Sequence, residues 1–332
     1  MKILAFGTYA VSIGVVALLA GCGGVQPIGE SSSSPQSYVR LLTNPRATAR
    51  TAMSHFGLLY ITDNGNGSVY VYTYPQGKFV QQFQYAPIQS PAGDCVDDRG
   101  NVFITGYNGH DVLIYSRGAA QPKAVLSDPG YPMGCSIDPI THNLAVANSQ
   151  DRSAGPGNVA IWKDPITSNN SGGPTFVYSN LQFLEPTWCT YDDRGNLFVD
   201  GQDYSHRKVS LAELPKGANS FVSISVGIYL GWPPGNVQWD GQYITISVGN
   251  TIYQLSFSGS TAYVVGSTQL PLNWTLQGYS IETVGAKDAQ QRKLVATSGG
   301  NIGLFQYPSG KGPAQVISQN FPLDPVVSPA TH

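Results

Sequence analysis

A small set of aromatic and ionisable residues has the types and spacing to form one binding or reactive site. Trp and Tyr rings offer flat apolar faces that stack on sugar rings or hold an extended peptide, while carboxylates and imidazoles accept hydrogen bonds or move protons. The candidates are Tyr131, Glu185, Trp188, Trp232, Trp274, His110, His206 and Asp203. Together they predict an aromatic-rich rim that binds a glycan, a cell-wall fragment or a protein.

Two other interpretations of these residues stay open. The Trp rings could fill gaps between strands and cover the end of a channel, in which case they stabilise the fold and bind nothing. Alternatively, Glu185 with His110 or His206 could serve as the acid and base of an enzyme. The chain has no Gly-x-Ser-x-Gly or His-Glu-x-x-His segment, and one carboxylate does not hold a divalent cation specifically. We therefore favour binding over catalysis and predict no catalytic residue, metal or cofactor. An envelope scaffold protein without a small-molecule ligand is a further alternative.

An internal repeat indicates which elements position the candidate residues. Four segments begin at a Pro and carry an Asp six residues later, and these Asp residues are Asp97, Asp138, Asp192 and Asp240. Weaker copies flank them, so that successive copies start near residues 50, 91, 132, 186, 234 and 278. A period of roughly 40 to 50 residues is typical of the four-stranded blades of a β-propeller.

Each repeat contains four strand signals and few helix signals. In the second repeat the strands are expected at residues 93–97, 102–106, 112–116 and 123–126, separated by turns rich in Asp, Asn and Gly. The sequence thus predicts an all-β fold, a six-bladed β-propeller of four-stranded blades over residues 44–325, with a tail at 326–332. A seven-bladed ring or a long sandwich fits the residue count less well.

The repeat pattern, Pro-x-Gly-small-x-Asp followed by Gly-Asn-[Val/Leu]-Phe-[Ile/Val], resembles the NHL repeat and the related YncE-like and SMP-30-like six-bladed propellers. This resemblance implies the fold but not one function, because the scaffold hosts binders, lyases and lactonases. SMP-30-like lactonases hold a divalent metal with a Glu, an Asn and an Asp. Glu185, just before Pro186, matches the Glu, but the Asn and Asp have no match at the equivalent positions. A virginiamycin-lyase-like activity would need a His and Glu pair.

The amino terminus carries a targeting signal. Residues 19–22 read Leu-Ala-Gly-Cys and follow an apolar run from Ile3 to Leu18, which resembles the lipobox of bacterial lipoproteins. The resemblance implies a signal peptide of residues 1–21, a lipidated Cys22 and a place in the bacterial cell envelope, on the outer membrane if there are two. Residues 22–43 then form a Ser-rich tether. The alternative, a membrane-spanning helix, is less favoured because about 18 apolar residues barely cross a bilayer.

The remaining cysteines are Cys95, Cys135 and Cys189, all on the predicted first strands of consecutive repeats. We predict three buried thiols that carry no chemistry. A disulfide between Cys135 and Cys189 is the alternative, and a three-Cys metal site would need a further ligand.

Composition and turn chemistry exclude other functions. Charged residues make up 11% of the chain and the net charge is -2, so no basic face exists for nucleic acid. The Asp-Asp-Arg-Gly segments at 97–100 and 192–195 are interpreted as structural turns, because Asp and Gly favour turns for backbone reasons. They are expected at the end of the propeller opposite the rim.

Overall fold

The computed structural model describes residues 56–83, 90–166, 172–179, 181, 183, 185–203, 208–229, 235–282 and 292–330. The chain divides into two units, Met1–Leu42 and Thr43–His332, and every described residue belongs to the second. The predicted signal peptide, Cys22, the tether, His206 and Trp232 therefore lie outside the described residues. Within the described part, no helix is long and apolar enough to cross a membrane.

The described residues form 24 strands and no helix. In chain order the strands are β1 (Gly57–Asp63), β2 (Ser68–Tyr74), β3 (Phe79–Phe83), β4 (Pro91–Val96), β5 (Val102–Gly106), β6 (Asp111–Tyr115), β7 (Ala124–Ser127), β8 (Gly130–Ile137), β9 (Leu144–Asp151), β10 (Pro156–Trp162), β11 (Phe176–Tyr178), β12 (Glu185–Tyr191), β13 (Leu197–Asp203), β14 (Lys208–Leu214), β15 (Val222–Val226), β16 (Val237–Trp239), β17 (Ile244–Val248), β18 (Thr251–Ser258), β19 (Thr261–Gln269), β20 (Gly278–Ile281), β21 (Lys293–Ser298), β22 (Asn301–Gln306), β23 (Gln315–Ser318) and β24 (Pro322–Ser328).

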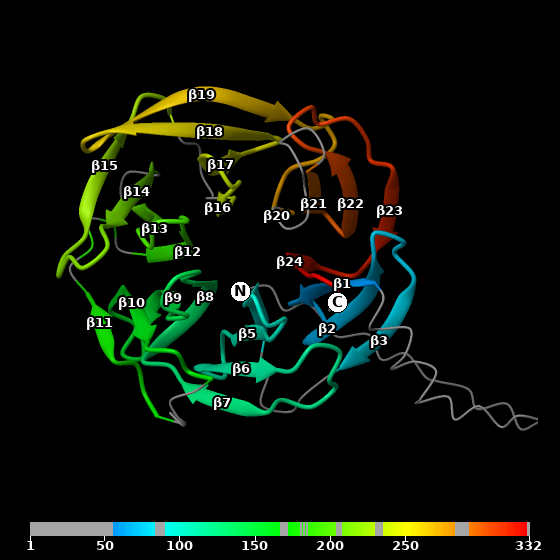
Figure 1. Cartoon of the computed structure of the whole chain (residues 1–332), viewed down its shortest axis with the longest axis horizontal. Coiled ribbons are helices and arrows are strands. Elements are labelled where there is room, and N and C mark those ends of the chain that lie inside the picture. The colour runs from blue at the N-terminus through cyan, green and yellow to red at the C-terminus, as the bar shows by residue number, and fades with distance from the viewer. Residues whose placement is uncertain are drawn as a thin grey trace, which may run out of the picture. The chain divides into compact units, whose positions relative to one another are not determined.

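These strands form antiparallel sheets placed around a common axis, a propeller-like arrangement (Figure 1). In the second repeat the observed strands β4 to β7 match the four predicted strands to within two residues at each end. The agreement follows from local chemistry, since the Asp and Gly turns end each strand before the β-rich run of the next begins. The all-β prediction is confirmed for the described residues.

The sheets differ from six separate four-stranded units. Four sheets have four strands each, but one has eight, in the order β12-β13-β14-β15-β19-β18-β17-β16. Its two antiparallel halves are joined where β15 pairs in parallel with β19, through Ser225↔Thr261 and Val226↔Ala262. The join arises because β19 is nine residues long and its first residues reach the free edge of the neighbouring outer strand.

The two ends of the described chain meet in one sheet. The strand order β24-β1-β2-β3 places β24 beside β1, with pairs from Leu58↔Ser328 to Asp63↔Pro322. The carboxyl-terminal strand thus closes the ring as the innermost strand of the first sheet. β24 ends at Ser328, so it includes the start of the segment predicted as a tail.

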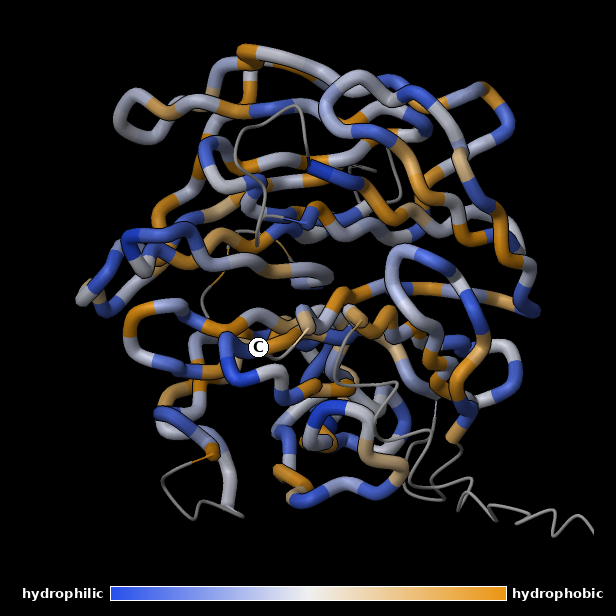
Figure 2. Tube along the Cα trace, turned by 45° about the vertical axis from the view of Figure 1, so that its right-hand side comes forward, coloured by the Kyte–Doolittle hydropathy of each residue, from blue (hydrophilic) through white to orange (hydrophobic). Residues whose placement is uncertain are grey.

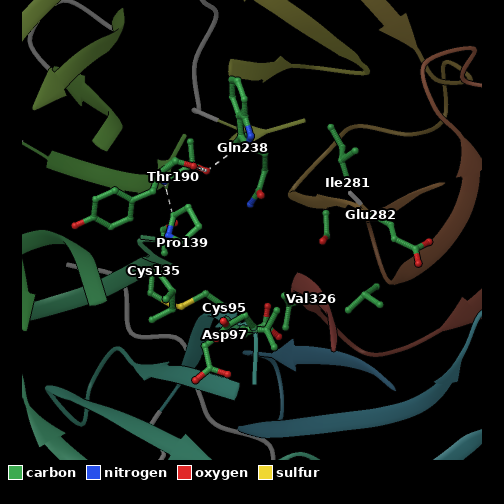
Figure 3. Close-up of a pocket in the computed structure, with 18 of the residues that line it drawn as sticks. Cys95, Asp97, Cys135, Pro139, Thr190, Gln238, Ile281, Glu282 and Val326 are labelled. Carbon is green, nitrogen blue, oxygen red and sulfur yellow. Dashed lines mark hydrogen bonds between the residues drawn. A yellow bond between two sulfur atoms is a disulfide. The ribbon is translucent and has the colours of Figure 1, made fainter. Parts of the chain in front are cut away.

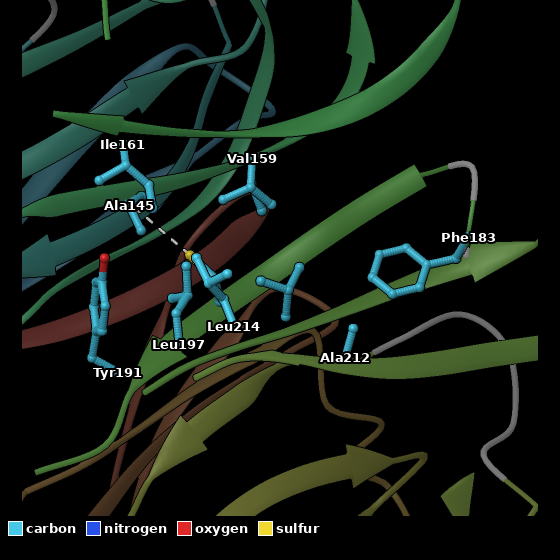
Figure 4. Packing of buried hydrophobic residues seen from close by; sticks show 11 residues of the cluster. Ala145, Val159, Ile161, Phe183, Tyr191, Leu197, Ala212 and Leu214 are labelled. Atoms are coloured by element: carbon cyan, nitrogen blue, oxygen red, sulfur yellow. Dashed lines mark hydrogen bonds between the residues drawn. The ribbon is translucent and has the colours of Figure 1, made fainter. Parts of the chain in front are cut away.

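Hydrophobic side chains fill the spaces between neighbouring sheets. Hydrophobic residues occur as short segments throughout the strands rather than in one block (Figure 2). In one such cluster, Ala145 and Val159 from β9 and β10 meet Leu197 and Leu214 from the next sheet, with Tyr191 at one end (Figure 4). Each sheet therefore buries both faces, which favours the apolar β-branched residues of the repeat.

Candidate functional site

The repeated Asp residues of the Pro-to-Asp pattern are structural. Asp97 Oδ1 accepts hydrogen bonds from the backbone N–H groups of Arg99 (3.0 Å) and Asn101 (2.7 Å). Asp192 accepts the equivalent bonds from Arg194 (2.9 Å) and Asn196 (2.8 Å). The prediction that these segments are turns is confirmed, because the carboxylates are used to close them.

Three aromatic rings gather at the β5–β6 hairpin, where the rim was predicted. The His110 ring packs edge-on against Tyr131, with centroids 4.3 Å apart, and Tyr107 lies 5.2 Å from Tyr131. His110 Nδ1 donates to the carbonyl of Gly130 at 2.6 Å, so this nitrogen carries a proton. The structure thus brings His110 and Tyr131 together, with Tyr107 as an addition that the sequence analysis did not include.

Glu185 is held elsewhere on the same side of the fold. It begins β12, and its Oε2 accepts a hydrogen bond from Gln202 Nε2 at 2.8 Å. Among the described residues, Glu185 contacts Gln202, whereas His110 and Tyr131 contact each other. Asp203 ends β13. These contacts do not pair Glu185 with His110, and His206, the other predicted partner, lies outside the described residues. No group of three or more described His, Cys, Asp or Glu residues is arranged to hold a metal ion.

Two of the predicted rim tryptophans lie in the hydrophobic core. Trp188 is 3% exposed and packs with Phe198, Val237 and other core residues of two neighbouring sheets. Trp274 is 4% exposed and meets Phe305 edge-on at 5.0 Å. Their rings present no face for stacking on a ligand. These two Trp residues therefore stabilise the fold by filling the space between sheets, as the first alternative predicted.

Gly134 explains how Trp188 fits between the sheets. A Cβ atom at position 134 would lie 2.7 Å from the Trp188 ring and 2.9 Å from its Cα. The ring therefore covers the backbone of β8, and only glycine permits this approach.

Trp188→Ala is expected to lower the free energy of unfolding by about 3–5 kcal/mol, the usual cost of removing a buried Trp from a core. Chemical denaturation followed by far-UV circular dichroism measures this change. Tyr131→Ala, at the half-buried rim position, is the matched control and should cost much less. Equal costs in the two variants would contradict the core position of Trp188.

The cysteines form one disulfide, which corrects the prediction of three buried thiols. Cys95 and Cys135 are bonded, with Cα atoms 5.7 Å apart, and Cys189 is a free buried thiol. The alternative pairing of Cys135 with Cys189 is also wrong. The inner strands β4 and β8 lie side by side, which brings Cys95 and Cys135 together. The Cα–Cα distance of 5.7 Å between Cys95 and Cys135 is typical of a disulfide.

A pocket lies at the carboxyl ends of the inner strands, near the axis of the ring (Figure 3). Its volume is about 390 Å³, within the range of small-molecule sites. All six inner strands contribute to it: β4, β8, β12, β16, β20 and β24. Because the Asp97 and Asp98 turn also lines it, the pocket lies at the end of the ring opposite the predicted rim.

The pocket wall combines apolar and hydrogen-bonding groups. Val96, Ile137 and Val326 supply apolar surface, while half-buried Gln238 and Trp239 supply amide and indole groups. The Cys95–Cys135 disulfide forms part of the same wall (Figure 3). Ser136 Oγ and Thr190 Oγ1 each accept a hydrogen bond from the next inner strand, from the backbone N–H groups of Tyr191 (3.0 Å) and Trp239 (3.1 Å). These bonds fix the strands that shape the pocket.

Buried carboxyl groups lie at the inner end of the pocket. Asp94 on β4 lines it, and Asp324 on β24 is next to it, with Asp324 Oδ2 accepting the Asp94 backbone N–H at 3.1 Å. Asn236 Nδ2 donates to Asp324 Oδ1 at 3.2 Å. Burial, and then the charge of Asp324, hold the pKa of Asp94 well above its usual value, and burial likewise raises the pKa of Asp324.

The sequence analysis missed every residue of this pocket except the cysteines and the turn aspartates. One signal was present, because Asp94 stands three residues after its Pro, where the other three copies have Cys135, Cys189 and Val237. A carboxyl group at an otherwise apolar strand position indicates either a buried hydrogen-bonding role or a ligand contact.

The fold defines the chain as a β-propeller-like protein. Among solved structures it is similar to a chain in the crystal structure of a nidogen/laminin complex, with a TM-score of 0.59 and 14% identity over 83% of this chain and 99% of that chain. It is also similar to a functionally unknown protein from Desulfotomaculum acetoxidans DSM 771, with a TM-score of 0.51 and 11% identity over 80% of this chain and 78% of that chain. At these identities the likeness shows the fold alone. No family model matches the chain, and no curated protein matches it.

Proposed function

We propose that this protein is a lipid-anchored recognition module of the bacterial cell envelope that binds a small ligand in the central pocket of a six-bladed propeller. The observation that carries the proposal is the pocket of about 390 Å³ to which all six inner strands contribute. A site built from six elements is shaped by the whole ring rather than by one loop, which is how propellers position ligands near their axis.

The six-bladed, NHL-like interpretation is supported by the repeat of inner strands. Each of β4, β8, β12, β16, β20 and β24 starts a four-stranded antiparallel unit, β24 doing so through β1 to β3. The two halves of the eight-stranded sheet share only two residue pairs. We therefore count the eight-stranded sheet as two blades joined at their outer edge.

The central pocket replaces the aromatic rim as the proposed binding site. Trp188 and Trp274 are in the core, which leaves the rim with His110, Tyr131 and Glu185 among its described members. The pocket in contrast offers an indole, an amide and apolar surface around one cavity. Such a mixture suits a ligand of monosaccharide or short-peptide size, including a fragment of the cell wall.

A pocket-blocking variant tests the proposal. Ser280 is half-buried and lines the cavity, so Ser280→Trp should fill it, whereas Tyr131→Ala removes the rim ring on the other side. Wild type and both variants are compared on glycan and peptide arrays, with melting temperatures recorded for each. Loss of binding in Ser280→Trp alone supports the pocket. Loss in Tyr131→Ala alone would instead assign binding to the rim.

The envelope location rests on the lipobox-like segment, and the disulfide supports it because disulfides persist mainly in oxidising compartments. Cys22→Ala is expected to move the protein from the membrane fraction to the soluble fraction and to abolish incorporation of a labelled fatty acid. Cys189→Ala is the control and should remain membrane-bound and labelled. Labelling that persists in Cys22→Ala would contradict the anchor.

A further inference from the structure

The inner end of the central pocket holds a carboxyl group with unused hydrogen-bonding capacity. Asp94 lines the pocket and is 4% exposed. Neither of its two carboxylate oxygens has a hydrogen-bond partner among the described residues. Leaving a buried polar group without a partner costs about 1–3 kcal/mol, and more when it is charged. A group from a bound ligand would remove that cost.

Asp324 differs from Asp94, because its hydrogen bonds are made within the protein. Its two oxygens accept from the Asp94 backbone N–H and from Asn236 Nδ2, and its own backbone N–H donates to Thr62 Oγ1 at 3.1 Å. These contacts fix the Asp324 carboxyl group beside Asp94. The pair places two acidic groups together at one point of the cavity.

Among the described residues that line the pocket, none carries a positive charge to balance them. No Lys or Arg is among the described residues that line the pocket, whereas Asp94, Asp97, Asp98 and Glu282 are. Two of these acids are already used, since Asp97 closes its turn and Glu282 accepts a hydrogen bond from Tyr74 Oη at 2.8 Å. A cation at the inner end must therefore come from the ligand.

We propose that the central pocket binds a ligand bearing a protonated primary amine, whose ammonium group donates to the carboxylate of Asp94 beside Asp324. The inference names the ligand class for the site in the proposed function and rests on it. A primary ammonium has three N–H donors and is satisfied by carboxylate oxygens at short range. The apolar wall of Val96, Ile137 and Val326 then contacts an aliphatic or sugar stem.

An ammonium fits these carboxylate oxygens better than a divalent metal does. Calcium takes six to eight oxygen ligands, and no group of three or more described His, Cys, Asp or Glu residues is arranged to hold a metal ion. Binding of an ammonium also favours the charged form of Asp94, so the ligand and the proton compete for the same carboxyl group.

Calorimetric titration at pH 7 with putrescine and with glucosamine tests this inference. The neutral analogue of putrescine is butane-1,4-diol, and those of glucosamine are glucose and N-acetylglucosamine. We expect wild type to bind at least one amine and to bind its neutral analogue at least tenfold more weakly. Asp94→Asn keeps the shape and removes the charge, and it should weaken amine binding at least tenfold. Asp193→Asn is the matched control, because Asp193 lies on the equivalent exposed turn of another repeat and does not line the pocket; it should bind as wild type does.

Several results would overturn the amine inference while leaving the proposed function in place. These are equal binding of amines and neutral analogues, unchanged binding in a folded Asp94→Asn variant, or binding of calcium chloride in place of the amines. Failure to bind either amine at about 10 mM, roughly a hundredfold above a dissociation constant of about 0.1 mM, also overturns it. The proposed function fails separately, if Ser280→Trp leaves array binding intact. Melting temperatures of all variants confirm that each is folded.

Discussion

Replacing both Cys95 and Cys135 by Ala is expected to lower the free energy of unfolding by about 4 kcal/mol. The disulfide closes a loop of 40 residues between the inner strands of two neighbouring sheets, and the chain-entropy estimate for such a loop is about 4 kcal/mol. Urea denaturation of the double variant against wild type, both without reductant, measures the difference. Wild type in excess reductant should approach the double variant.

Cys189→Ala is the matched control for this experiment. Cys189 is buried and its Sγ lies 3.7 Å from the carbonyls of Gly134 and Ala145, but it closes no loop. Its removal is expected to cost only about 1 kcal/mol, in line with the loss of a small buried group. If the control lost as much as the double variant, packing rather than the crosslink would explain the effect.

The free energy of unfolding should fall as the pH rises from about 4 to about 8, because of Asp200. Burial raises the pKa of Asp200 to about 8, whereas an unfolded Asp titrates near 3.9. Between these values the unfolded state has lost the proton that the folded state keeps, so each pH unit lowers the stability by about 1.4 kcal/mol. The full effect is present below pH 4 and is lost as the pH rises through about 8, about 6 kcal/mol in all. Asp128 and Asp324, whose pKa values burial raises to about 7 and about 8, act in the same direction, as does Asp94, whose pKa burial also raises.

Comparison of Asp200 with the equivalent residues of other repeats explains why its carboxyl group keeps a proton, and indicates a variant that tests this. Thr105 and Thr297 stand at the position equivalent to Asp200 in their repeats. Each Thr hydroxyl accepts a hydrogen bond from a backbone N–H of the inner strand of its own sheet. Each also donates to a backbone carbonyl of the inner strand of the next sheet, at Met133 (2.6 Å) for Thr105 and at Leu323 (2.8 Å) for Thr297. Asp200 Oδ1 accepts from the Trp188 N–H at 2.8 Å, but Oδ2 has no partner among the described residues. Only a protonated carboxyl could donate as the Thr hydroxyls do.

Asp200→Thr should therefore flatten the pH dependence by about 1.4 kcal/mol per pH unit between pH 4 and pH 8. It should also be more stable than wild type at pH 8. Melting temperatures across this range measure the slope, with Asp193→Thr on an exposed turn as the control. An unchanged slope in Asp200→Thr would show that other groups set the pH dependence.

Local chemistry allowed the strands and turns to be predicted. The Asp97 and Asp192 turns use side chains that lie within four residues of the atoms they bind, so their structure is encoded in a short segment. The strands of the second repeat follow for the same reason. The disulfide could not be predicted in this way. Cys135 and Cys189 each stand three residues before the turn Asp of their repeat, while Cys95 stands two before. The bond between Cys95 and Cys135 therefore joins positions that are not equivalent in the repeat.

The sequence by itself determined the repeat, the all-β class and the turns, because these depend on residues close together in the chain. Only the tertiary structure decided which repeats touch, since inner strands from six distant segments converge at one axis. That convergence buried Trp188 and Trp274, made β24 the innermost strand of the first sheet, and placed Asp94 beside Asp324, 230 residues away. It also put the pocket at the end of the ring where the sequence had indicated only turns.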